Sequence, residues 1–159
     1  MGAYTFAPVK VVWKEIASEI EAAVLVGSEA VPDHKLVCVA FDQEAPAFFL
    51  AAFLNSTPVA AFVRAYAIQA SISGHIFDYA AVPTFDPENP THRALADLGE
   101  QCSAAAVDGE SSALVQLEQT VDTAVAGLLG IDKRSPGDPQ QSVRLLRLTK
   151  RERERELAQ

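Results

Sequence analysis

The sequence predicts an α+β fold, in which a small antiparallel sheet packs with a helix pair and further helices follow toward the carboxy terminus. Two observations predict it. Residues 1–41 contain short runs of β-branched residues bounded by polar, turn-prone segments. Beyond them, up to residue 131, apolar residues recur at helical spacing between breaks that contain proline or glycine.

Three strands are expected at the amino end. The segment Val9–Lys14 alternates charged and apolar side chains, which places Lys10 and Lys14 on one face of the strand. Two further β-rich runs, residues 22–26 and 35–41, are separated by a turn-prone segment at residues 31–34. We expect the three strands to be antiparallel.

A helix pair is predicted next. Asp42 can cap a first helix, whose apolar positions within residues 49–54 recur at helical spacing. The segment 55–58, Asn-Ser-Thr-Pro, ends that helix and starts another, because Ser and Thr are good caps and proline suits a first turn. The second helix should cover residues 58–67, with Arg64 off its apolar face.

The remainder of the body alternates loops and helices. Residues 71–77 are polar and contain glycine, so a loop should lead into a short strand near residues 79–82. Three prolines in residues 83–90 exclude a helix and an interior strand there. Thr91 can cap a helix to about residue 107, and an apolar stripe predicts another over residues 110–129, which a glycine then ends.

The charge distribution divides the chain into a body, residues 1–131, and a tail, residues 132–159. Residues 1–132 hold five Lys or Arg against 17 Asp or Glu, whereas residues 133–159 hold eight against four. A net charge of -8 disfavours binding to nucleic acid through a broad basic surface, so DNA contacts by the body must be local. The tail begins with a Pro- and Gly-containing linker and continues as a charged, helical or disordered segment.

The chain has no signal for export or membrane insertion, so we expect a cytoplasmic protein. Its longest apolar run, residues 45–54, is far shorter than the ~20 residues of a membrane span. Cys38 and Cys102 lie apart, without neighbouring Cys or His at metal-ligand spacing, which indicates two reduced packing thiols. The three histidines likewise do not form a zinc pattern.

Six blocks of the sequence occur in an order that resembles the carboxy-terminal part of large adenine-specific DNA methyltransferases of restriction-modification systems. No single block is diagnostic, but their succession covers about residues 7–131. The blocks are APVKVVWK (7–14), PDHKL (32–36), FFLAAFLNS (48–56), SISGHI (71–76), VPTFDPENPTHRALA (82–96) and VDTAVAGLLGI (121–131).

The resemblance implies a module that recognises the DNA target. In that family a separate, preceding domain binds S-adenosylmethionine and methylates adenine. The methylation motif, Asn or Asp followed by two prolines and an aromatic residue, does not occur in this chain, and neither does a Gly-rich cofactor turn. We therefore expect no cofactor and no catalytic residue in this chain, and expect double-stranded DNA and the methyltransferase catalytic domain as its partners.

Six residues are candidates for DNA binding. Lys10 and Lys14 could contact phosphates, or they could line a solvent-exposed edge face, where lysines discourage aggregation. Ser71, Ser73 and His75 could donate to phosphates or base edges, or they could bond the backbone of their own turn.

Arg64 is the sixth candidate, although an arginine on an apolar helix more often covers its neighbours with its stem. Trp13 is expected in the core rather than stacked on a base. The alternative function is a protein-interaction or structural module without DNA contact, which the negative charge favours.

Overall fold

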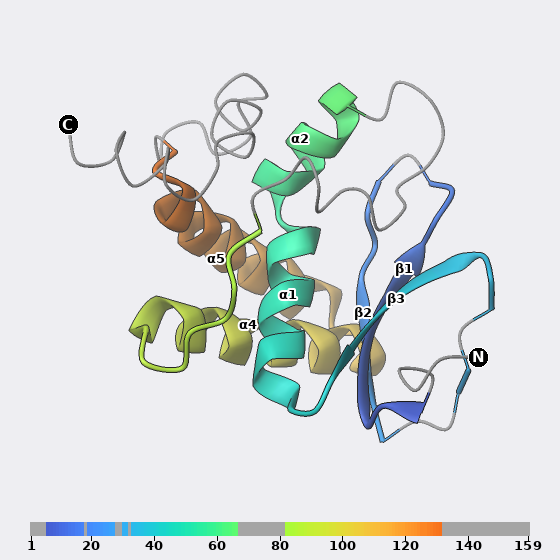
Figure 1. Ribbon diagram of the computed structural model, residues 1–159. Coiled ribbons are helices and arrows are strands. Elements are labelled where there is room, and N and C mark those ends of the chain that lie inside the picture. Colours follow the sequence, from blue (N-terminus) through green and yellow to red (C-terminus); the bar gives the residue numbers. More distant parts are fainter. Residues whose placement is uncertain (1–5, 18, 28–29, 32, 67–81, 132–159) are drawn as a thin grey trace.

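The computed structural model describes residues 6–17, 19–27, 30–31, 33–66 and 82–131. Its elements confirm the α+β fold and the three antiparallel strands (Figure 1). In chain order they are β1 (Val9–Lys14), β2 (Ala23–Val26), β3 (Leu36–Phe41), α1 (Glu44–Asn55), α2 (Thr57–Tyr66), α4 (Pro90–Asp108) and α5 (Ser111–Leu129).

The sheet has the order β2-β1-β3, so the first strand of the chain is the central one. Both neighbours are antiparallel, and the register pairs Val11 with Val24 on one side and with Val39 on the other. Val11 is fully buried and Trp13 is 1% exposed, which confirms that Trp13 belongs to the core. The described helices lie on one side of the sheet (Figure 1), and the side chains of Val11 and Trp13 pack in the core between the sheet and these helices.

Helix α1 is the centre of the fold. It lies between the sheet and the α4–α5 pair (Figure 1), and every residue from Ala47 to Leu54 is buried. A helix that is apolar all round suits this position, because it has packing partners on every side. Its N-cap is Gln43, which makes no side-chain capping bond, so the prediction that Asp42 caps this helix is wrong.

The junction between α1 and α2 is built from hydrogen bonds. The Ser56 hydroxyl is buried and donates to the Phe53 carbonyl at 2.7 Å at the end of α1, and the Ser56 carbonyl accepts from the backbone N–H of Ala60 in α2 at 2.9 Å. Among the described residues no single helix is long and apolar enough to cross a membrane. The pair α1 and α2, bent by 56°, passes that test only by combined length and composition.

Helices α4 and α5 form a hairpin that packs on α1. The side chain of Asn89 accepts from the backbone N–H groups of Thr91 and His92, so Asn89 is the N-cap of α4. It lies two residues before Thr91, so the prediction that Thr91 caps this helix is wrong. Gly109 and Gly130 end α4 and α5 with φ angles of 72° and 70°. The stop at Gly130 confirms the prediction, because this left-handed backbone favours glycine.

Candidate nucleic-acid interface

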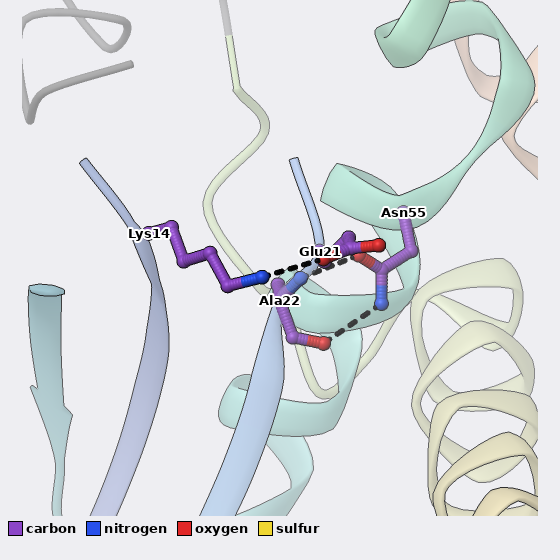
Figure 2. Close-up of polar contacts among 4 residues, drawn as sticks. All are labelled: Lys14, Glu21, Ala22 and Asn55. Atoms are coloured by element: carbon purple, nitrogen blue, oxygen red, sulfur yellow. Dashed lines mark hydrogen bonds and ion pairs between the residues drawn. The ribbon is translucent and has the colours of Figure 1, made fainter. Parts of the chain in front are cut away.

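Lys14 is an exposed cation at the end of the central strand. Its amine lies 3.4 Å from a carboxylate oxygen of Glu21, and both side chains are largely exposed (Figure 2). An exposed ion pair of this kind contributes about 0–1 kcal/mol, so a phosphate could displace the carboxylate at little cost. The nearby negative charge of Glu21 nevertheless weakens the attraction for phosphate.

Asn55 fixes the position of Glu21 and its neighbours. Its amide oxygen accepts from the backbone N–H of Ala22 at 2.7 Å, and its amide nitrogen donates to the carbonyl of Ala22 at 2.9 Å (Figure 2). The last residue of α1 thus pairs with the backbone immediately before β2, as a neighbouring strand would. Glu21, the partner of Lys14, is therefore next to a residue whose backbone Asn55 holds in place.

Arg64 is the second exposed cation, on the last turn of α2. Its Nε lies 3.2 Å from a carboxylate oxygen of Glu19, and 60% of its side chain is exposed. The connection between β1 and β2 therefore supplies the acidic partner of both exposed candidates. This arrangement was missed from the sequence, since charge pairs between separate elements depend on how those elements pack.

Lys10 is buried, which corrects the expectation that it contacts phosphate beside Lys14. Its side chain is on the same face of β1 as that of Lys14, but the residue is 1% exposed and its amine donates to the carbonyl of Ala30 at 3.1 Å. The alternative expectation of an exposed edge face is also wrong for Lys10, because β1 is the central strand. Its ammonium group stabilises the chain segment at Ala30 and is not available to DNA in this structure.

The remaining candidates, Ser71, Ser73 and His75, lie outside the described residues, as does most of the strand expected at residues 79–82. The described chain resumes at Val82, which packs against the core cluster. Arg64 is therefore the described candidate nearest to them in the chain.

A groove of about 780 Å³, lined in part by Arg64, lies between the edge strand β2 and the helices; we call it the β2–α5 groove. Its floor contains small residues of α1 and α4, among them Ala51, Ala52 and Gly99. Polar groups on its walls already serve the fold, because Asp122 accepts from both the backbone N–H and the hydroxyl of Thr57. Asp122 of α5 therefore caps α2.

The β2–α5 groove and its surroundings do not supply a nucleophile or a metal site among the described residues. Burial and the charge of Glu118 raise the pKa of the Cys102 thiol, so it has less thiolate than an exposed cysteine and is not an activated nucleophile. No group of three His, Cys, Asp or Glu side chains in the described segments could hold a metal ion. Asp42 and Gln43 join β3 to α1.

His92 is a structural residue beneath the start of α4. It is 7% exposed, its ring lies 4.7 Å from that of Phe49, and its Nδ1 accepts from the backbone N–H of Asp86 at 3.0 Å. Burial lowers the pKa of His92, against the opposing effect of the Asp86 charge, so the ring is neutral and Nδ1 is free to accept. The block at residues 82–96 therefore forms the start of α4, and His92 packs in the core beneath it.

The comparisons with known proteins do not assign this arrangement to a family. The chain matches no protein-family model, and no curated protein matches it.

Proposed function

We propose that this chain is the DNA target-recognition and docking module of an adenine-specific DNA methyltransferase of a restriction-modification system. In this proposal another domain binds S-adenosylmethionine and transfers the methyl group. The module positions the duplex so that the catalytic domain can act on an adenine turned out of the base stack.

One observation carries the proposal: the described blocks that resemble those enzymes meet in a single core. Trp13, Phe49, Leu95 and Val125 come from four of these blocks, and all belong to one buried cluster. The four blocks therefore contribute to one structural unit, as consecutive blocks of a single recognition domain would.

The proposed DNA contacts are few and local. Lys14 and Arg64 are the exposed candidates on the described surface, and Ser71, Ser73 and His75 complete the proposed set. Lys10 is withdrawn as a contact and acts in our proposal only by holding the Ala30 segment. Because the body carries a net negative charge, we propose that the rest of its surface faces solvent or the catalytic domain.

A fluorescence anisotropy titration with duplex DNA tests the proposal. Two phosphate contacts predict that the logarithm of affinity falls with the logarithm of salt concentration with a slope of about -2. Arg64→Ala should reduce this slope by about 1, whereas the control Arg93→Ala should leave it unchanged. Arg93 is a suitable control because it is an exposed arginine in the first turn of α4. Its guanidinium donates to the carbonyl of Pro87, which precedes that helix.

Two results would count against the proposal. Equal losses for Arg64→Ala and Arg93→Ala would indicate nonspecific attraction. No binding at any salt concentration, with or without a methyltransferase catalytic domain, would favour the alternative of a protein-interaction module. The excess of 17 acidic over five basic residues in residues 1–132 argues for that alternative.

A further inference from the structure

The β2–α5 groove has an apolar rim that the described residues leave uncovered. Val107 at the end of α4 is 84% exposed and Val115 on α5 is 52% exposed, and both line the groove. These two exposed valines lie beside a groove lined by small residues, and covering them with another apolar surface would lower the free energy. The groove therefore has both the space and the apolar surface to bind a peptide segment.

The helices around this rim are strongly acidic. Between residues 90 and 129 the chain has six acidic residues and one basic residue, Arg93; the acidic residues are Asp97, Glu100, Asp108, Glu110, Glu118 and Asp122. Glu118 lines the groove, and within the described segments no ion pair neutralises it. A segment that combines apolar and basic side chains would complement this surface.

The tail of the same chain has that chemistry. Residues 143–151 read VRLLRLTKR, with four apolar residues, four basic residues and no acidic residue. The tail is also long enough to reach the groove. At 1.5 Å per residue, Val115 lies about 21 Å back along α5 from Leu129, whereas residues 130–141 can span up to about 40 Å when extended.

We propose that residues 143–151 dock in the β2–α5 groove of their own chain. The apolar side chains of the segment cover Val107 and Val115, and its basic side chains face Glu118 and the acidic hairpin. Docking from within the chain is favoured because the connecting residues keep the segment near the groove at a high effective concentration. This proposal does not depend on DNA binding.

Cys102 provides a built-in probe of docking, because it lines the groove and is half-buried, whereas Cys38 lies on β3 outside the groove lining. The full chain is alkylated with iodoacetamide and each cysteine is followed by mass spectrometry. We expect a full chain carrying both Leu145→Asp and Leu148→Asp to be alkylated at Cys102 about fivefold faster, as removal of a favoured docked state should produce. Cys38 should react at an unchanged rate.

Leu157→Asp is the matched control, since it alters a tail leucine outside residues 143–151 and should leave both rates unchanged. Raising NaCl from about 0.05 to about 0.5 M should also accelerate Cys102 in the wild-type chain by screening the charges. An unchanged Cys102 rate in the double variant would overturn the proposal. So would protection that grows with protein concentration, because a second copy would then occupy the groove.

Discussion

Gly99 is a position where α4 approaches α1 closely, and its replacement tests the packing of the two helices. A Cβ atom added there would lie 2.4 Å from the carbonyl oxygen of Phe48 and 3.2 Å from the Cβ of Ala52. The first contact is with backbone, which cannot rotate away as a side chain can. Gly99→Ala must therefore push the two helices apart or distort one of them.

The expected cost follows from two opposing effects. Forcing extra atoms into a well-packed core typically costs about 1–3 kcal/mol, and a backbone clash belongs at the upper end of that range. Alanine in place of glycine within a helix returns about 1 kcal/mol. We therefore expect Gly99→Ala to lower the free energy of unfolding by about 2 kcal/mol, which corresponds to a Tm decrease of about 6 °C.

Urea denaturation followed by circular dichroism measures this change, and Gly127→Ala is its matched control. Gly127 is a helical glycine of α5 with nothing within 4 Å of an added Cβ and no positive φ. Its replacement should stabilise the chain by about 0.5–1 kcal/mol. If Gly99→Ala proved as stable as Gly127→Ala, the close approach of α1 and α4 would be refuted.

Three further predictions concern polar groups. Asn55→Ala should cost about 1–2 kcal/mol, because it removes both bonds to Ala22, and amide exchange at Ala22 should accelerate. Asp122→Ala should cost about 1–2 kcal/mol in urea denaturation by uncapping α2 at Thr57. His92 has a pKa below 6.5, so its contribution to stability is complete above that pH and is lost as the pH falls through the lowered value. His92→Asn removes this titration and should flatten the stability profile between about pH 7 and 5.

Each of these predictions has a control or a contrary outcome. His34→Asn, which alters an exposed histidine, should leave the pH profile steep. An unchanged profile in His92→Asn would assign the acid sensitivity to other groups. Wild-type exchange at Ala22 in Asn55→Ala would show that water replaces the amide. Replacement of Asp122 without loss of stability would mean that Thr57 finds another acceptor.

The secondary structure was largely predictable because it depends on local patterns. Alternating polarity located Val9–Lys14, and an apolar stripe followed by a glycine located α5 to within one residue at its start. Capping was predicted less well. Asp42 and Thr91 are good capping residues, but neither is an N-cap in the structure. Gln43 is at the N-cap position of α1, and Asn89 caps α4.

The candidate site was only partly predictable, because it depends on contacts between distant segments. Strand periodicity correctly placed Lys10 and Lys14 on one face of β1, but it could not show that the Ala30 segment covers the first of them. The bonds of Asn55 to Ala22 link residues 33 positions apart, and nothing in the local sequence marks them. The burial of Lys10 depends on a segment distant in the sequence, so strand periodicity alone could not predict it.

The bonds between Asn55 and Ala22 also affect how the sheet ends. An edge strand normally offers unpaired N–H and C=O groups that can recruit a strand from another molecule. The side chain of Asn55 bonds both the N–H and the C=O of Ala22, so these two groups, next to β2, are not available to pair with another strand. A single amide thus removes one residue from the backbone open to a strand of another molecule, and it anchors the end of the neighbouring acidic connection.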